Sequence, residues 1–223
     1  MRLGEAAQVR HYKLQEESGR AWQTALTKAR LAAGATYENF IVTTGGRYAR
    51  NEIEVALEGA GASCELGGSF LLAGEQQVDN RLQVDHIAPN GTSRQTYKGV
   101  LDERSHGVFQ GKTVVHRDAQ KSDGNQLSRA LLLSPDAIMD AKPELKIYAD
   151  DVKCSHGATV GELDDEQLFY LRARGIDEAS ARSLLIAAFM EEHLQSITDD
   201  AARDWLRGAV SGWLAQRLSG GEG

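Results

Sequence analysis

Hydrophobic and polar residues alternate along most of the first 158 residues, in short runs divided by turn residues. Ile53, Val55 and Leu57, for example, alternate with glutamates and an alanine. This period of two is typical of β-strands that bury one face. Pro89-Asn90-Gly91 follows another such run and is a strong turn signal. The pattern predicts a series of short strands from the N-terminus to about Ala158.

Glycines punctuate these runs, and we expect several of them to mark strand ends. Gly67-Gly68 precedes the apolar run of residues 70–72, and Gly111 is predicted to be a turn between two valine-containing strands. No helical segment long enough for a βαβ crossover separates the strands, and this disfavours a doubly wound fold. A sandwich, a barrel and a β-solenoid remain open, and the absence of strict internal repeats argues mildly against a regular solenoid.

The first strand is expected over Val9 to Leu14, with no capping element ahead of it. A sheet that begins in this way exposes an unpaired edge. The pattern therefore leaves open whether Met1 is a native start or the boundary of a fragment, and whether another molecule covers this edge.

Beyond about Leu163 the apolar spacing changes to that of helices. Asp164, followed three residues later by Gln167, is typical of a capping box. A short helix is predicted over 165–174, and Gly175 is its expected left-handed stop.

Two further helices are predicted to begin at Asp177 and Thr198. Their expected buried stripes are Ala181, Leu184, Leu185, Ala188 and Phe189, and then Ala202, Trp205, Leu206, Ala209, Trp213 and Leu214. For the two tryptophans we favour core packing over a partner groove. The chain thus divides into a strand region over 1–162, a helical region over 163–218 and a mobile tail over 219–223.

Composition narrows the class of protein. The formal net charge of −7 disfavours a general nucleic-acid binder, which would carry a basic face. Two cysteines, Cys64 and Cys154, are too few for a disulfide framework, and no run is apolar and long enough to span a bilayer. We therefore expect a soluble, cytoplasmic protein.

The strongest chemical signal is the pair Cys154 and His156, two residues apart in a segment expected to be extended. In a strand, this spacing points both side chains to the same face. Thiolate and imidazole are ligands that iron and zinc accept. Two ligands do not complete a metal site, so further donors would have to come from elsewhere or from a second chain.

Other polar candidates have simpler interpretations. His106 and the run His116-Arg117-Asp118 could form a catalytic pair, but no nucleophile has a recognisable context, so we expect surface residues. Asp150-Asp151 lacks the further oxygen ligands of a hard-cation site. His86 and Cys64 are expected to be structural.

Several motifs together resemble the SufB/SufD family, most closely SufD and its C-terminal core portion. The resemblance is densest from about Val100 to Ile176. The matching runs are Gly107-Val108-Phe109-Gln110-Gly111-Lys112, Asp118-Ala119-Gln120-Lys121, Leu131-Leu132-Leu133-Ser134-Pro135, the segment from Glu144 to Thr159 that contains Cys154-Ser155-His156-Gly157, and the segment from Asp165 to Ile176.

The resemblance implies a mainly β fold, with a right-handed parallel β-helix core followed by a small helical domain. It also implies a non-catalytic scaffold of the SUF iron–sulfur cluster assembly system. Cys154 and His156 match D-type positions proposed to lie at the interface with SufB, where a transient iron–sulfur cluster would be shared rather than held stably by this chain alone. Family members usually carry an extra N-terminal region that precedes the β-helix, and this sequence lacks it.

The resemblance also implies partners. The helical region would dock the SufC ATPase, since the chain has no phosphate-binding loop of its own. The β-helix would pair with SufB, or with a second copy of the chain.

Two alternatives from other classes remain open. The first is a β-helix enzyme acting on acidic polysaccharide, using residues such as Asp118, Lys121 and Arg129. The second is a metal-free solenoid that serves only for protein interaction.

Overall fold

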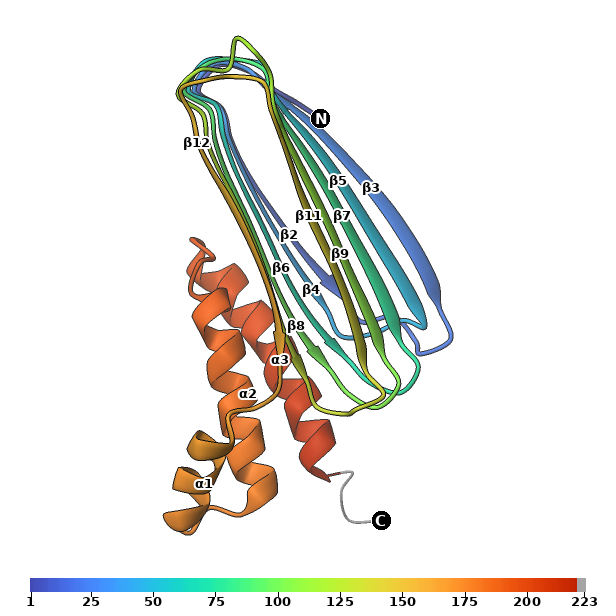
Figure 1. Ribbon diagram of the computed structural model, residues 1–223. Coiled ribbons are helices and arrows are strands. Elements are labelled where there is room, and N and C mark those ends of the chain that lie inside the picture. Colours follow the sequence, from blue (N-terminus) through green and yellow to red (C-terminus); the bar gives the residue numbers. More distant parts are fainter. Residues whose placement is uncertain (220–223) are drawn as a thin grey trace.

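The computed structural model describes residues 1–219, in which twelve β-strands precede three α-helices (Figure 1). Of the predicted tail, residues 220–223 lie outside the described part. No helix within residues 1–219 combines the length and apolar character needed to cross a bilayer. The elements are β1 (Arg2–Leu3), β2 (Gln8–Gln15), β3 (Trp22–Leu31), β4 (Thr36–Thr43), β5 (Tyr48–Leu57), β6 (Ser63–Leu72), β7 (Gln77–His86), β8 (Thr92–Leu101), β9 (His106–Val115), β10 (Asp123–Leu132), β11 (Ile138–Ile147), β12 (Lys153–Gly161), α1 (Asp165–Ala173), α2 (Glu178–Leu194) and α3 (Asp200–Ser219).

The strands form two six-stranded parallel sheets that face each other (Figure 1). Sheet A has the order β1-β3-β5-β7-β9-β11, and sheet B has the order β12-β10-β8-β6-β4-β2. The chain passes from one sheet to the other at every turn, so each strand stacks on the strand two places earlier. This arrangement is a parallel β-solenoid, as the family resemblance implies, and it excludes the sandwich and the barrel.

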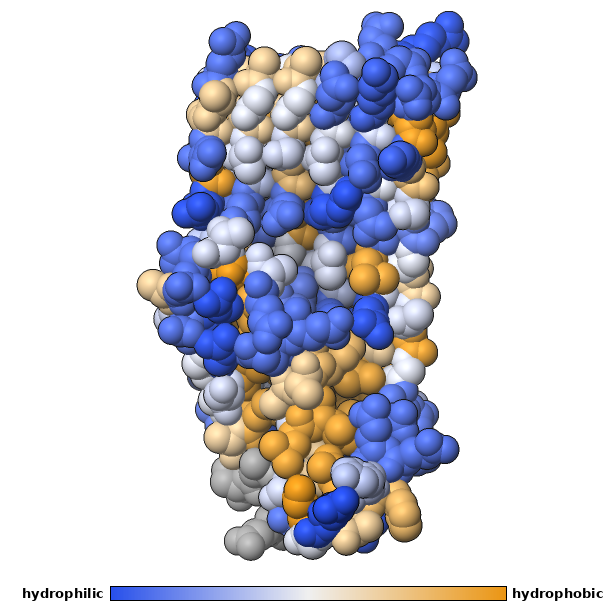
Figure 2. All heavy atoms as spheres, turned by 90° about the vertical axis from the view of Figure 1, so that its left-hand side faces the viewer, coloured by the Kyte–Doolittle hydropathy of each residue, from blue (hydrophilic) through white to orange (hydrophobic). Residues whose placement is uncertain are grey.

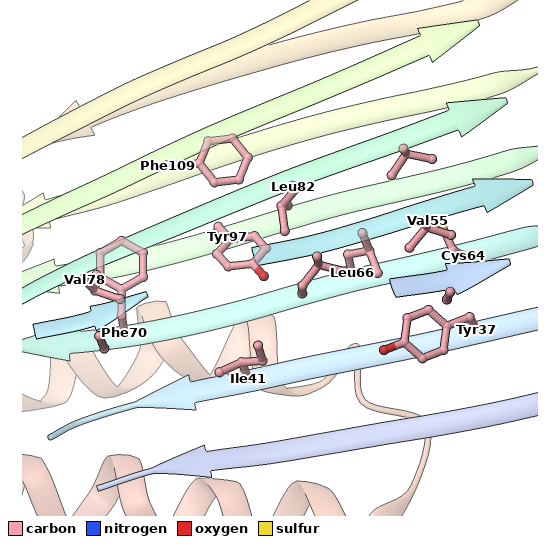
Figure 3. Close-up of a cluster of buried hydrophobic side chains, with 14 of the residues drawn as sticks. Tyr37, Ile41, Val55, Cys64, Leu66, Phe70, Val78, Leu82, Tyr97 and Phe109 are labelled. Atoms are coloured by element: carbon pink, nitrogen blue, oxygen red, sulfur yellow. The ribbon is translucent and has the colours of Figure 1, made fainter. Parts of the chain in front are cut away.

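The main core fills the space between the two sheets (Figure 3). Large rings from the two sheets pack against each other there, and the centroids of the Tyr97 and Phe109 rings lie 5.3 Å apart with the planes tilted by 40°. Aliphatic residues such as Ile53, Leu66 and Leu82 fill the remaining space. The alternation seen in the sequence therefore marks the residues that point into the solenoid.

Three glycines that the sequence analysis placed at turns or strand boundaries lie inside strands. Gly67 and Gly68 are in β6 and Gly111 is in β9. A Cβ on Gly67 would lie 2.4 Å from the Phe40 ring, and a Cβ on Gly68 would lie 2.2 Å from the Tyr97 ring. A Cβ on Gly111 would lie 2.9 Å from the ring of Phe109, two residues earlier on the same strand. The prediction of turns or boundaries was wrong because nearby rings, and not backbone conformation, require these glycines.

The helix signals are confirmed at the first two helices. The Asp164 carboxylate accepts hydrogen bonds from the backbone N–H groups of Glu166 and Gln167, and Gly175 has a φ of +87°. Asp177 likewise accepts from the N–H of Ser180 at the start of α2. These side chains satisfy backbone donors that a helix leaves without partners.

The third helix begins at Asp200 and not at Thr198. The Thr198 hydroxyl donates to Glu38 Oε2 at 2.6 Å, and Tyr12 donates to the other oxygen of the same carboxylate, also at 2.6 Å. Glu38 thus ties the α2–α3 connection to sheet B. The helix starts after Asp199, whose carboxylate accepts from the Ala202 N–H at 2.8 Å.

α2 and α3 pack on the outer face of sheet B. A second core forms there from sheet residues and helix residues, namely Phe40, Val42, Leu71, Val100, Ile186, Met190, Leu194, Ile197, Leu206, Val210, Trp213 and Leu214. The predicted stripes were partly wrong. Leu184, Ala188 and Trp205 are exposed, with 51% of Trp205 accessible, whereas Trp213 is buried as expected.

Two polar side chains are buried in this second core. Lys98 is 2% exposed, and its ammonium donates to the carbonyl oxygen of Phe189 at 2.9 Å and to Glu192 at 2.6 Å. His193 lies beside Ser69, with 3.1 Å between Nδ1 and the hydroxyl oxygen. Burial, assisted by the charge of Lys98, lowers the pKa of His193 to about 3.

Candidate functional site

Cys154 and His156 lie on β12, which is the terminal strand of sheet B. They pair in register with Gly124 and Gln126 of β10. Those two residues are buried and alternate with half-buried neighbours, so they belong to the inward face of the strand. Residues that pair in a parallel ladder point to the same face of the sheet, so the partners of these two residues on β12 also point inward. Cys154 and His156 therefore share the inward face at the last turn of the solenoid.

The Cys154 side chain is half-buried against a small apolar cluster formed by Val115, Ala119 and Ala149. Gly124 of β10 lies between Cys154 and Ser93 of β8 in the ladder of sheet B. A Cβ on Gly124 would lie 3.5 Å from Cys154 Sγ and 3.5 Å from the Ser93 hydroxyl oxygen. The sulfur atom is thus held close to the interior of the solenoid while part of it reaches the open end.

Burial raises the pKa of the Cys154 thiol, and the negative charge of Asp123 acts in the same direction, although a backbone hydrogen bond from Gly124 opposes both. The thiol is therefore protonated at neutral pH. A metal ion that binds the sulfur must displace this proton, so binding will be favoured at higher pH.

His156 is exposed, because the solenoid ends here. Within the described residues, no strand pairs with the outer edges of β11 and β12. The inward positions of β11 face the same end, and the side chains of Met139 and Leu145 there are only half-buried. The site thus lies at an open end that offers two free strand edges and a row of apolar side chains.

A polar layer lies directly behind His156, in the interior. Gln126 and Gln95 follow His156 in the ladder of sheet B, and both are almost completely buried. Each side-chain amide donates from Nε2 to the Thr113 hydroxyl oxygen at 2.7 Å. The sequence analysis missed these residues, because their proximity to His156 depends on the strand register.

The donor set of this site is small. Among residues 1–219, no three His, Cys, Asp or Glu side chains come close enough together to hold a metal ion. Cys154 and His156 supply two donors of types that iron accepts, fewer than the four of a closed tetrahedral site. Any metal at this position needs ligands from outside the described residues.

Comparisons with known proteins decide the family. The family described as "SUF system FeS cluster assembly, SufBD core domain" matches residues 1–189. The chain belongs to the SufBD family. It is 35% identical to the iron–sulfur cluster assembly protein SufD of Escherichia coli over 215 residues, which cover 96% of this chain and 50% of that protein.

Two other relatives are covered to a similar extent. Protein ABCI7 of Arabidopsis chloroplasts is 39% identical over 211 residues, covering 93% of this chain and 44% of the relative. A SufBD family protein of Synechocystis is 37% identical over 209 residues, covering 94% and 46%. The chain therefore spans about half the length of these relatives.

The remaining candidates of this SufBD-family chain make contacts of their own. His106 Nε2 lies 2.8 Å from an oxygen of Asp140, and His116 Nε2 lies 3.3 Å from one of Asp85, so the two histidines have separate carboxylate partners. The Asp150-Asp151 pair is exposed in a turn, where the Asp151 N–H donates to Gln120.

The residues considered for a polysaccharide enzyme are not brought together. Asp118 and Lys121 lie in the turn before β10, whereas Arg129 lies six residues into that strand, about 20 Å along it. Arg129 instead approaches Glu192 of α2 at 3.7 Å. This arrangement gives no support to that alternative.

His86 and Cys64 are interior residues, as expected. His86 has 2.8 Å between Nε2 and the Ser93 hydroxyl and 3.1 Å between Nδ1 and the Ser122 hydroxyl. Burial lowers the pKa of His86 to about 4 and raises the pKa of Cys64 to about 12. Both groups are neutral near pH 7, as suits residues packed inside a solenoid.

Proposed function

We propose that the chain is a non-catalytic, SufD-type scaffold subunit in iron–sulfur cluster assembly. Cys154 and His156 contribute this subunit's share of the ligands for a nascent cluster, and a partner contributes the rest. The cluster is cargo that is built and released. The observation that carries the proposal is the placement of these two donors together on the inward face of an open solenoid end.

An incomplete ligand set suits this role. A closed site would hold iron tightly, whereas two donors per chain bind it firmly only while two chains are joined. Separation of the chains would then release the cluster. The protonated Cys154 thiol adds to this control, because its proton must leave before the sulfur can bind iron.

The open end is the proposed surface for pairing with a SufB-type subunit, or with a second copy when the chain is alone. Free strand edges favour pairing with another chain. Exposed apolar side chains near this end support the same assignment, and they are Ile138, Ile147, Tyr148 and Val160. Pairing there would bring the partner's ligands next to Cys154 and His156.

The helical region, taken as a domain over 163–218, is the proposed docking surface for a SufC-type ATPase. Exposed apolar side chains gather on the helical part of the face shown in Figure 2. In this region Phe169 is 73% exposed, and Tyr170, Leu184 and Trp205 are each more than half exposed. Aromatic anchors of this kind dominate the energetics of protein interfaces.

The ligand role is tested by reconstitution with iron and sulfide under anaerobic conditions, together with SufB-type and SufC-type partners. The double variant Cys154→Ala, His156→Ala should lose most of the cluster absorbance and bound iron. Cys64→Ala, which removes the other thiol, should retain both. Unchanged cluster formation by the double variant would refute the ligand role and favour a metal-free interaction solenoid.

Docking of the ATPase is tested by substitution and not by deletion, because removal of the helices would expose the apolar outer face of sheet B. Phe169→Ser together with Trp205→Ser should weaken capture of the ATPase subunit at least tenfold. Tyr148→Ser, which is equally exposed but lies at the solenoid end, should not. Equal capture by all three proteins would place the docking surface elsewhere.

A further inference from the structure

Two buried glutamines in the interior each leave an oxygen atom without a hydrogen-bond partner. Gln95 is 0% exposed and Gln126 is 1% exposed. Both donate Nε2 to the Thr113 hydroxyl oxygen at 2.7 Å, and the Oε1 atom of each has no partner among the described residues. A buried acceptor in this state is unfavourable, so such atoms are rare in native proteins.

Thr113 cannot satisfy both of these acceptors. A threonine hydroxyl has one proton to donate, and two amides converge on it. Even if either amide were reversed, at least one buried oxygen would remain without a donor. The layer therefore lacks a donor for at least one buried oxygen.

The position of Gln126 indicates where that donor would come from. Gln126 pairs in register with His156 of β12. Its Oε1 atom lies 3.2 Å from the position that a Cβ on Gly111 would take, and Gly111 pairs with Pro143 of the terminal strand β11. The free oxygen thus lies directly behind the last turn of the solenoid, to which His156 belongs.

A histidine that binds a metal through one ring nitrogen carries a proton on the other. That N–H is almost always donated to a carboxylate, a carbonyl or a water molecule, which fixes the tautomer and the orientation of the ring. Gln126 offers a carbonyl oxygen that lacks a donor, one ladder step from His156. An inward rotation of the exposed His156 side chain would supply that donor.

We propose that Gln126 is the positioning residue for His156, accepting its ring N–H when the other ring nitrogen binds iron. The inference rests on the proposed function, since it assumes that His156 is a ligand. When the metal binds, the hydrogen bond from the His156 ring to Gln126 Oε1 favours the inward orientation of the ring. The His156 ring is then held beside Cys154 when the metal arrives.

Gln95 provides a matched control within the same chain. It shares the burial, the Thr113 partner and the unpaired oxygen of Gln126, but it lies one ladder step further from His156. A purely structural role of the polar layer would make the two glutamines equivalent. A positioning role toward His156 makes only Gln126 sensitive.

The test is an anaerobic titration with cobalt(II) of the full chain joined to a SufB-type partner, since the two donors of one chain do not complete a site. Cobalt(II) accepts the thiolate and imidazole ligands of ferrous iron and absorbs visible light. Gln126→Met should weaken cobalt binding about 10- to 100-fold, the range typical of lost partners of metal-bound histidines. Gln126→Glu, which keeps an acceptor oxygen, should restore it. Gln95→Met should bind cobalt like the unsubstituted chain.

A second readout is the tautomer of His156, followed by nitrogen NMR on histidine-labelled protein loaded with zinc. The unsubstituted chain and Gln95→Met should show a single metal-bound tautomer, whereas Gln126→Met should show a mixture. In a His156→Ala background, Gln126→Met should cause no further loss of cobalt affinity.

The outcomes separate this inference from the proposed function. If cobalt binding requires Cys154 and His156 but Gln126→Met binds like the unsubstituted chain, the positioning role is wrong and the ligand role stands. Equal losses for Gln126→Met and Gln95→Met would also overturn it, as a structural effect. If the double variant of Cys154 and His156 binds cobalt normally, both the ligand role and the positioning role are wrong.

Discussion

The two sheets of the solenoid bury their inner faces alike, but their outer faces are in different environments. On β5 of sheet A, buried residues alternate with half-buried residues along the whole strand. On β4 and β6 of sheet B nearly every residue is buried, because α2 and α3 cover part of the outer face. Strands with the same backbone geometry thus differ in which of their side chains contribute to stability.

The polar residues of the two outer faces differ in the same way. On sheet A, Lys28 pairs with Glu54 at 2.7 Å, and water reaches both side chains, which are 59% and 39% exposed. On sheet B, Lys98 is buried beneath α2, where its ammonium donates to the Phe189 carbonyl oxygen and to Glu192, whose side chain is 65% exposed. An outward polar residue is therefore an exposed surface group on one sheet and part of a packed interface on the other.

The largest expected effect comes from two leucines on outer faces. Leu71→Ala, under the helices on sheet B, should lower the free energy of unfolding by about 3 kcal/mol, since it opens a cavity in a packed cluster. Leu26→Ala, on the exposed face of β3, should change it by less than about 0.5 kcal/mol. Urea unfolding followed by circular dichroism measures both, and similar losses would mean that the helices do not seal sheet B.

Substitution of Lys98 should have the second-largest effect on the free energy of unfolding. Lys98→Met keeps the length of the side chain but leaves the Phe189 carbonyl oxygen without its charged donor, so we expect a loss of about 2 kcal/mol. Glu192→Gln should be milder, because water reaches that side chain. A larger loss for Glu192→Gln than for Lys98→Met would contradict this ranking.

His193 should make the covered face sensitive to acid. Its pKa is about 3 in the folded chain and near 6.5 when unfolded, so the unfolded chain takes up the proton first as the pH falls. Stability should therefore decline from pH 6.5 downward, by up to about 1.4 kcal/mol per pH unit.

Substitution should isolate this contribution. The difference in unfolding free energy between His193→Met and the unsubstituted chain should change between pH 6.5 and pH 4.5. His106→Met, on the outer face of sheet A, is the comparison. A pH-independent difference for His193→Met would show that the buried imidazole does not drive the acid sensitivity.

The exposed ion pair of sheet A should have the smallest effect. Lys28→Ala should change the free energy of unfolding by less than about 1 kcal/mol, because water solvates both partners when they separate. The residual effect should shrink further in 0.5 M salt, where charges are screened. A loss that matches that of Lys98→Met would remove the distinction between the two faces.

Features that depend on neighbours in the sequence could be predicted correctly. Asp164 and Asp177 cap their helices, Gly175 adopts a positive φ, and Asn90 has the positive φ (61°) of a turn. Each of these depends on backbone groups within a few residues of the side chain.

Features that depend on the next turn of the solenoid could not be predicted in this way. Gly67 and Gly68 were read as marking a strand boundary, but the Phe40 and Tyr97 rings require glycine inside β6. Trp205 shares the helical spacing of Trp213 but is exposed. The packing of α3 on sheet B decides which of its residues are buried, and Trp205 is not among them.

The candidate site likewise combines features that depend on sequence neighbours with features that depend on the next turn of the solenoid. The spacing of Cys154 and His156 was enough to place them on one face, since a strand has a period of two. Gln126 and Thr113 carry no local signal, because their proximity to His156 follows from parallel register and from the opposite sheet.

The sequence by itself determined the alternation of the strands, the helix caps and the pairing of a thiol with an imidazole on one face. Tertiary structure alone decided that this face lies at an open end, that a buried polar layer lies behind it, and that the helices cover one sheet and not the other. The physical reason is the separation along the chain of the residues that interact. Backbone hydrogen bonds in caps and turns form between near neighbours. Stacking in a parallel solenoid joins residues that are a full turn apart in the chain.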